Sequence, residues 1–254
     1  MLERIVDATR ARIAGLDVSG LKSRAQDLPA ARSLAGALLA PGMGVIAEVK
    51  RRSPSRGELA AGLDPAKQSL AYQEGGAAAI SVLTEPEFFD GSLADLEAVR
   101  GAVTVPVLRK DFILEPAQVW ESKLVGADAV LLIVAALTDR QLEDLIGEAD
   151  TAGLDALVEV HTHAEAERAM TAGARVVGVN NRDLGSFDID LATAEALAGP
   201  ISEAKVRVAE SGIFSGAEAE RMAACGYHAV LVGEALVRAS DPAVLVAELR
   251  GMGP

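Results

Sequence analysis

The 254-residue sequence is poor in cysteine, histidine and aromatic residues. Its single cysteine, Cys225, excludes a disulfide within the chain. The three histidines, His161, His163 and His228, lack the spacing of a metal site. His161 and His163 alternate as residues at a strand end do, which favours a structural or surface role. We therefore expect neither a disulfide framework nor a metal centre.

Long apolar runs and an excess of positive charge are also missing. No stretch reaches the roughly 20 apolar residues that span a membrane, and residues 1–16 carry charges where a signal peptide would be apolar. The net charge is −13, which disfavours binding to nucleic-acid phosphates. These features predict a cytoplasmic protein that binds neither membrane nor nucleic acid. An anionic substrate would need a locally positive pocket.

Short β-branched runs alternate with amphipathic helical stretches along most of the chain. The runs AVLLIV and HAVLVG lack polar alternation, as expected for parallel strands buried on both faces. The stretches TDRQLEDLIGEAD and THAEAERAMTAG begin at threonines that can cap a helix. The pattern predicts eight strands, at residues 45–50, 79–83, 105–110, 129–134, 156–160, 176–180, 206–210 and 229–233.

Eight β/α units over about 200 residues favour a (β/α)₈ TIM barrel, because a doubly wound sheet usually stops at about five to seven strands. The first strand begins only near Val45, so residues 1–43 are predicted to be an N-terminal helical extension that covers one barrel end. Helices are expected there around residues 2–14 and 30–39. No linker separates this extension from the barrel at 44–254, so we expect one domain.

Charged and polar residues follow the predicted strands at their carboxyl ends, where TIM barrels carry out catalysis. Charges in apolar strands are costly to bury unless they are paired. One interpretation is a ring of salt bridges that only closes the barrel end. The presence of amide, aromatic and glycine residues favours instead an acid/base site for an anionic substrate. These strand-end residues are Glu48, Lys50, Lys110, Phe112, Glu159, Asn180, Asn181, Arg182, Glu210, Ser211, Gly212 and Gly233.

Two glycine turns have the composition of a phosphate site. SGIFSGAE follows the seventh predicted strand and VGEALVRA follows the eighth. Each places a glycine at the strand end before a helix, where free N–H groups and the helix dipole attract anions, and TIM barrels often bind phosphate in these two loops. Arg182 is either a further phosphate contact or a surface residue.

The segment EVKRRSPSRG, residues 48–57, continues the first predicted strand into a cationic loop that ends in glycine. We expect residues 51–57 to act as a lid that brings Lys50 and Arg51 or Arg52 over a negative substrate. The alternative is a solvated basic loop.

The motif EVKRRSPSRG resembles the strand-one signature of the indole-3-glycerol phosphate synthase family. The resemblance continues in order through SVLTEPEFFDGS, VPVLRKDFI, ADAVLLIVAAL, LVEVHT, VGVNNRDL, VAESGI and VLVGEAL. It implies a lyase of tryptophan biosynthesis that needs no metal or cofactor. Such an enzyme closes, decarboxylates and dehydrates 1-(2-carboxyphenylamino)-1-deoxyribulose 5-phosphate, a phosphorylated small molecule. We expect a monomer or a weak homo-oligomer.

The resemblance also implies a role for each matching residue. Lys110 resembles the general acid, Glu159 the general base, and Lys50 a second essential lysine near the substrate carboxylate. Glu48 and Glu210 resemble the carboxylates that orient the lysines. The implied substrate contacts are Asn180 and Ser211 for positioning; Ser53, Arg182, Gly212, Gly233 and the Glu234 backbone for phosphate; and Phe89, Phe112, Leu131 and Leu184 for the anthranilate ring.

The sequence departs from the family at Glu234, where some members have serine. A glutamate carboxylate would repel phosphate, so we expect only the backbone N–H of residue 234 to bind it, with the side chain turned away.

Three other functions fit parts of the pattern. A Schiff-base aldolase would use Lys110 or Lys50 as its nucleophile. Barrels that isomerise an aminated sugar phosphate share the two glycine turns, but the EVKRRSPSRG loop is not expected in them. A non-catalytic scaffold would have no need of Lys50, Lys110 and Glu159 together.

Overall fold

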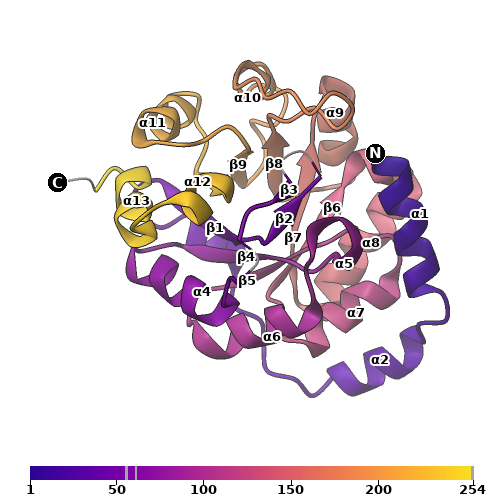
Figure 1. Cartoon of the computed structure of the whole chain (residues 1–254). Coiled ribbons are helices and arrows are strands. Elements are labelled where there is room, and N and C mark those ends of the chain that lie inside the picture. Colours follow the sequence, from indigo (N-terminus) through magenta and orange to yellow (C-terminus); the bar gives the residue numbers. More distant parts are fainter. Residues whose placement is uncertain (55–56, 61, 253–254) are drawn as a thin grey trace.

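The computed structural model describes residues 1–54, 57–60 and 62–252. Eight parallel strands form a closed barrel in the order β1-β10-β9-β8-β7-β6-β5-β4, with helices around it (Figure 1). This confirms the TIM barrel, and each strand end lies within two residues of its predicted position. The barrel strands are β1 Gly44–Val49, β4 Ala79–Leu83, β5 Val107–Lys110, β6 Ala129–Ile133, β7 Asp155–Val160, β8 Val176–Asn180, β9 Val206–Glu210 and β10 Ala229–Val232.

The barrel closes where β1 pairs with β10, and Val45 lies opposite Val230 in that register. Apolar side chains such as Ile46, Leu108 and Leu157 fill the interior and are fully buried. A second, larger apolar layer lies between the strands and the surrounding helices. Burial on both strand faces explains why the strand sequences lack polar alternation.

Helices follow the strands as the sequence predicts. Thr138 and Thr162 cap α8 and α9 by accepting hydrogen bonds from the backbone N–H groups of Gln141 and Glu165, which confirms both predicted caps. His163 is the first residue of α9 and does not extend a strand. The helices are α4 Pro65–Glu74, α5 Pro86–Phe89, α6 Leu93–Ala102, α7 Pro116–Leu124, the 3₁₀ helix Val134–Ala136, α8 Asp139–Ala152, α9 His163–Thr171, α10 Ala192–Leu197, α11 Gly216–Ala224, α12 Glu234–Arg238 and α13 Pro242–Leu249.

The N-terminal extension contains three helices, α1 Leu2–Ile13, α2 Val18–Ala25 and α3 Leu34–Leu38. The prediction missed α2, which begins at Val18 after its cap Asp17. The Asp17 carboxylate accepts a hydrogen bond from the N–H of Ser19. It also made the third helix too long, because that helix begins only after its cap, Ser33.

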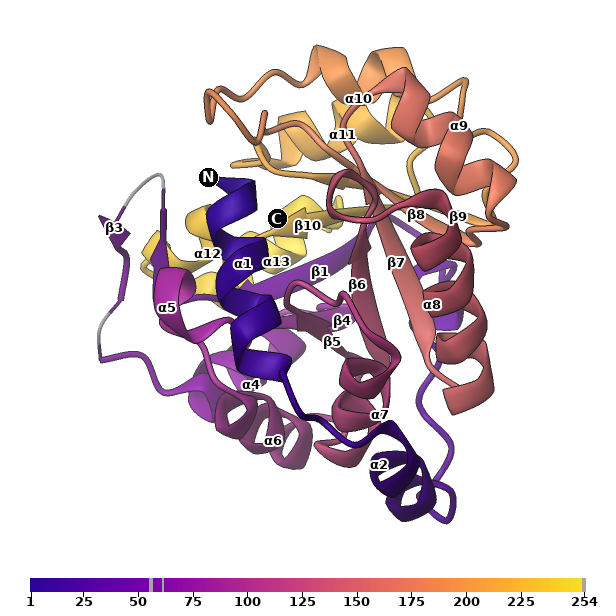
Figure 2. The same ribbon diagram turned by 90° about the vertical axis from the view of Figure 1, so that its right-hand side faces the viewer.

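The extension covers both ends of the barrel. Leu34 and Leu38 of α3 pack into the interior cluster and close the end at which the strands begin. Leu2 and Ile5 of α1 line a pocket at the opposite end, where the strands finish. In Figure 2, α1 lies beside α5 and α2 packs against α7. That extension and barrel form one domain stays a prediction.

A buried charge network connects α1 to β5. The Arg109 guanidinium, with a side chain only 1% exposed, contacts the carboxylates of Asp111 at 3.0 Å and Glu121 at 2.9 Å. Asp111 also accepts a hydrogen bond of 2.9 Å from Arg12 of α1. Burial opposes the charge of Asp111, but the two arginines outweigh it and lower the pKa of this carboxyl. Asp111 therefore attaches the extension to the barrel.

Replacing this carboxylate tests the attachment. Asp111→Asn should lower the free energy of unfolding by about 3–5 kcal/mol, because the charge of Arg109 would keep only Glu121 as a partner. Urea denaturation followed by circular dichroism measures the change. The control Asp7→Asn removes an exposed partner of Arg10 and should cost less than about 1 kcal/mol. Equal stabilities of the two variants, or separate unfolding of extension and barrel, would contradict the one-domain prediction.

Candidate active site

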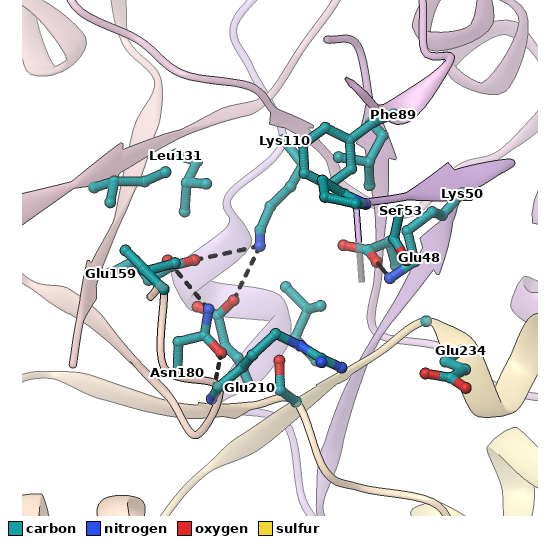
Figure 3. A pocket seen from close by; sticks show the side chains of 18 of the residues that line it. Glu48, Lys50, Ser53, Phe89, Lys110, Leu131, Glu159, Asn180, Glu210 and Glu234 are labelled. Carbon is teal, nitrogen blue, oxygen red and sulfur yellow. Dashed lines mark hydrogen bonds and ion pairs between the residues drawn. The ribbon is translucent and has the colours of Figure 1, made fainter. Parts of the chain in front are cut away.

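Lys110 lies at the centre of the pocket formed by the carboxyl ends of the strands. Its Nζ atom is 3.3 Å from Oε2 of Glu159 and 3.2 Å from Oε2 of Glu210 (Figure 3). The three residues come from β5, β7 and β9, and all three side chains are largely buried. The barrel thus brings one cation and two carboxylates from distant parts of the chain into direct contact.

The environment separates the proton affinities of these groups. Burial by itself opposes the charge of Lys110, but Glu210, Glu159 and Glu48 outweigh it and raise the pKa of this lysine. Burial likewise opposes ionisation of Glu159, yet Lys110 and His161 lower its pKa. Burial raises the pKa of Glu210 to about 7, with Glu159 and Glu48 adding to the rise. The pocket therefore shifts the pKa values of its two carboxyl groups in opposite directions, a separation typical of acid/base sites.

A second ion pair occupies the end of β1. Nζ of Lys50 is 2.6 Å from Oε1 of Glu48. The pair fits because residue 233 is glycine: a Cβ atom there would lie 2.4 Å from Oε1 of Glu48 and 3.0 Å from Nζ of Lys50. Gly233 therefore makes space for the Lys50 pair in addition to its predicted role in the turn.

Glycine is needed for the same reason on β8. A Cβ atom at Gly178 would lie 2.1 Å from Oε1 of Glu210, much closer than van der Waals contact allows. The absent side chain of Gly178 thus leaves room for the Glu210 carboxylate beside Lys110.

Two asparagines at the end of β8 have different surroundings. The Asn180 amide donates a hydrogen bond of 3.2 Å to Glu159 and accepts one of 3.0 Å from the Arg182 backbone. Asn181 is buried and donates to the carbonyl groups of Glu210 and Ser211. Asn180 thus faces the ionised carboxylate, whereas Asn181 holds the loop after β9 in place.

The two glycine turns both border the pocket. Ser211 and Gly212 adopt left-handed backbone conformations, with φ angles of 64° and 79°. The helix that follows this turn, α11, begins at Gly216, within the SGIFSGAE motif as predicted. Gly233 directly precedes α12, and the Glu234 carboxylate lies 3.3 Å from Arg238 of the same helix. Arg182 donates to the Phe187 carbonyl at 3.1 Å.

The apolar side of the pocket contains two aromatic rings. The centroids of Phe89 and Phe112 are 6.3 Å apart with an interplanar angle of 38°. Phe89 is held by the buried Glu85, whose carboxylate accepts hydrogen bonds from the first backbone N–H groups of α5. Leu131 and Leu184 complete this side. The pocket therefore joins an apolar face to a charged one.

Every residue to which the family resemblance gives a role lines this pocket, whereas the strand-end residue Asn181 is buried outside its lining. Sequence reasoning missed Met1, Leu2 and Ile5 of α1 and two aromatic residues at the rim, Phe187 and Phe214. The apolar spacing along α1 and the phenylalanine within SGIFSGAE were the available signals. It also assigned His161 only a structural or surface role, although His161 lies 3.3 Å from Glu159.

The predicted lid lies partly outside the described residues, at positions 55 and 56. Arg51 forms an ion pair with Asp95 of α6 and donates to the Leu63 carbonyl. In this structure Arg51 is thus directed to α6 instead of the substrate pocket, while Ser53 and Pro54 line the pocket.

Metal-binding clusters and membrane-spanning helices are both absent from the part of the chain that the structure describes. Across residues 1–54, 57–60 and 62–252, no group of three or more His, Cys, Asp or Glu side chains is arranged to hold a metal ion. Within the same ranges, every helix is too short or too polar to cross a bilayer.

Residues 2–249 match a family profile described as "Indole-3-glycerol phosphate synthase". The chain belongs to the indole-3-glycerol phosphate synthase family. Members of this family are carboxy-lyases of tryptophan biosynthesis that act on a phosphorylated small molecule, and the chain has this activity.

Curated relatives agree with this assignment, and two solved structures agree with the barrel fold. An indole-3-glycerol phosphate synthase of Rhodococcus jostii is 50% identical, covering 100% of this chain and 96% of the relative. That of Mycolicibacterium smegmatis is 49% identical, covering 98% and 93%. A 3-hexulose-6-phosphate synthase structure shares the fold with a TM-score of 0.66 at 16% identity, covering 84% of this chain and all of the other. A thiamine phosphate pyrophosphorylase from Pyrococcus furiosus gives 0.61 at 19%, covering 87% and 97%.

The space at Gly178 can be tested directly. Gly178→Ala should leave a folded barrel but lower kcat about a hundredfold, because the new methyl group displaces the Glu210 carboxylate from Lys110. Steady-state kinetics and far-UV circular dichroism measure the two effects. The control Gly147→Ala lies in α8, where a Cβ atom meets nothing within 4 Å, and should leave kcat unchanged. Normal turnover by Gly178→Ala would show that the placement of Glu210 is not needed.

Proposed function

We propose that this pocket carries out the ring closure, decarboxylation and dehydration of 1-(2-carboxyphenylamino)-1-deoxyribulose 5-phosphate with Lys110 as general acid and Glu159 as general base. The observation that supports these roles is the position of Lys110 between two carboxylates of different proton affinity, beside an apolar face that fits an aromatic ring. No redox or group-carrying cofactor is required, because the aromatic amine of the substrate supplies the electrons.

Ring closure joins the ring carbon that bears the carboxylate to the carbonyl carbon of the sugar chain. Lys110 gives a proton to the carbonyl oxygen as that bond forms, so no free alkoxide develops. Lys50 lies near the substrate carboxylate and stabilises the intermediate until carbon dioxide leaves and the ring becomes aromatic again. Glu48 orients Lys50 through their 2.6 Å ion pair.

Dehydration completes the indole. The new hydroxyl group leaves as water after it receives a proton from a lysine, and Glu159 removes a proton from the neighbouring carbon. Asn180 holds Glu159 by its 3.2 Å hydrogen bond, and Glu210 keeps Lys110 in position. Ser211 helps to position the substrate. The aromatic ring lies among Phe89, Phe112, Leu131 and Leu184, which all line the apolar side of the pocket.

The substrate phosphate binds at the two glycine turns, Ser211-Gly212 and Gly233-Glu234, with Ser53 and Arg182. The ion pair of the Glu234 carboxylate with Arg238 supports a phosphate contact through the backbone N–H alone. We further propose that the enzyme works in the cytoplasm as a monomer or weak homo-oligomer, without nucleic acid or membrane partners.

The acid and base assignments predict two severe variants. Lys110→Met should lower kcat by at least about 10²- to 10⁴-fold and change substrate binding by less than about tenfold, because methionine keeps much of the packing but carries no proton. Glu159→Gln should be similarly severe, since an amide keeps the shape and loses the basic charge. Turnover and binding are measured with the purified variants.

The control Lys205→Met replaces an exposed lysine and should keep normal kinetics. Near wild-type turnover by a folded Lys110→Met variant would make Lys110 a salt-bridge residue and transfer the acid role to Lys50.

The phosphate assignment predicts a change in binding instead of turnover. Arg182→Ala should raise KM about 10- to 100-fold and alter kcat much less, because a contact remote from the reacting carbons stabilises ground and transition states equally. Arg175→Ala is the control, since Arg175 is an exposed partner of Asp150 outside the pocket. An unchanged KM for Arg182→Ala would contradict the assignment.

Borohydride trapping distinguishes the Schiff-base mechanism from the proposed acid/base mechanism. The lysines in acid/base roles form no covalent adduct with the substrate, so reduction should leave the mass of the protein unchanged. A stable adduct on Lys110 or Lys50 would support the aldolase chemistry instead. Formation of indole product by the purified enzyme excludes the scaffold and the sugar isomerase.

A further inference from the structure

His161 lies directly behind the Glu159 carboxylate. Both belong to the same face at the end of β7, two residues apart, and Nε2 of His161 is 3.3 Å from Oε1 of Glu159. The other ring nitrogen, Nδ1, is 3.2 Å from the carboxylate of Glu165 on α9. The side chain of His161 is 9% exposed and that of Glu165 15%. The imidazole therefore stands between the pocket carboxylate and a carboxylate nearer to the surface.

This environment holds a proton on the imidazole. Burial lowers the pKa of His161, but its contacts with Glu159 and Glu165 outweigh that effect and raise the pKa to about 10. Asp183, an exposed carboxylate in the loop after β8, adds a further negative charge nearby. Nε2 is buried and its contact with Glu159 has ion-pair distance without the geometry of a directed hydrogen bond. His161 is thus an imidazolium at neutral pH, with one N–H facing Glu159.

The proposed reaction leaves the site one proton short. A lysine protonates the carbonyl oxygen in ring closure, and a lysine protonates the leaving hydroxyl group. The protein therefore gives two protons to the substrate. Glu159 recovers one proton from carbon. The substrate loses its carboxylate as carbon dioxide, so one proton is consumed in each turnover. If Lys110 gives both protons, it has to regain one between ring closure and dehydration, while the substrate fills the pocket.

We propose that His161 supplies this proton by giving the hydrogen on Nε2 to Glu159, which delivers a proton to the neutral amine of Lys110 after ring closure. The inference rests on the proposed roles of Lys110 and Glu159. In this step the N–H bond of the imidazolium breaks as an O–H bond forms on Oε1 of Glu159. The carboxyl group then turns toward Lys110, and the same O–H bond breaks as an N–H bond forms on Lys110. The imidazole regains its proton from solvent after the product leaves.

The two oxygens of Glu159 fit this transfer. Oε1 faces His161 at 3.3 Å and Oε2 faces Lys110 at 3.3 Å, so the carboxylate connects donor and acceptor. A neutral lysine amine is ordinarily a stronger base than imidazole, so the amine left on Lys110 after ring closure can take up a proton from the His161 imidazolium.

A purely structural role for His161 makes different predictions. Glu165 accepts a 2.7 Å hydrogen bond from the backbone N–H of His161 as well as contacting its ring, so the pair also fixes the start of α9. A group that only positions Glu159 can be replaced by another N–H donor, whereas a proton donor cannot. His161→Gln makes this distinction, because its amide keeps an N–H near Glu159 but has no acidic proton to give.

The test is a single turnover with excess enzyme and 1-(2-carboxyphenylamino)-1-deoxyribulose 5-phosphate, in weak buffer with a pH indicator. In the wild-type enzyme, indole absorbance should appear before proton uptake from solvent, because His161 supplies the proton during chemistry. In His161→Gln, indole formation should slow about a hundredfold and coincide with proton uptake. Its far-UV spectrum and substrate binding should stay normal.

The control His163→Gln changes the neighbouring exposed histidine, which pairs with Glu167 at 3.5 Å, and should behave as wild type. Simultaneous indole formation and proton uptake in the wild-type enzyme would overturn the inference without any variant. Normal indole formation by His161→Gln would also overturn it and leave a positioning role. Failure of the wild-type enzyme to form indole would instead contradict the proposed function itself.

Discussion

Charge buried at the open end of the barrel has to be compensated by other charge, and this constraint determines how the site is built. Lys110 has Glu159 and Glu210 as partners, and Lys50 has Glu48. An unpaired charge at any of these buried positions would cost several kcal/mol. The free protein therefore keeps its reactive groups paired with each other, and a bound substrate offers its own carboxylate and carbonyl oxygen in exchange.

The alternation of β5 divides consecutive charged residues between two tasks. Lys110 points into the barrel, while its neighbours Arg109 and Asp111 point outward beneath the helices. Lys110 lies in the pocket. Asp111, which pairs with Arg109, binds Arg12 of α1, and the first turn of α1 lines the same pocket. One short strand thus couples the position of the proposed acid to the position of the extension that covers it.

The sequence was sufficient for the barrel and for the charged residues of the pocket, because strand periodicity places reactive residues at one end and the family motifs identify them. It was insufficient for the partners of those residues. Gly178 looks like any small strand residue until the Glu210 carboxylate is seen beside it. The sequence places Glu159 and His161 two residues apart, but nothing in it shows that Glu165 of α9 contacts the His161 ring. The helix α2 was missed because its only strong signal was the cap Asp17.

The space left by Gly178 in β8 and by Gly233 after β10 affects how this enzyme should be altered by random mutagenesis. In the proposed arrangement Gly178 touches no substrate atom and Gly233 offers only its backbone to the phosphate, so a library aimed at side-chain contacts with the substrate would treat both as free positions. The space beside Gly178 holds the Glu210 carboxylate, and the space beside Gly233 holds the Glu48 carboxylate. A side chain of any size at either position would clash with that carboxylate. Libraries that keep both glycines fixed should therefore contain a larger share of active members than libraries of equal size that vary them.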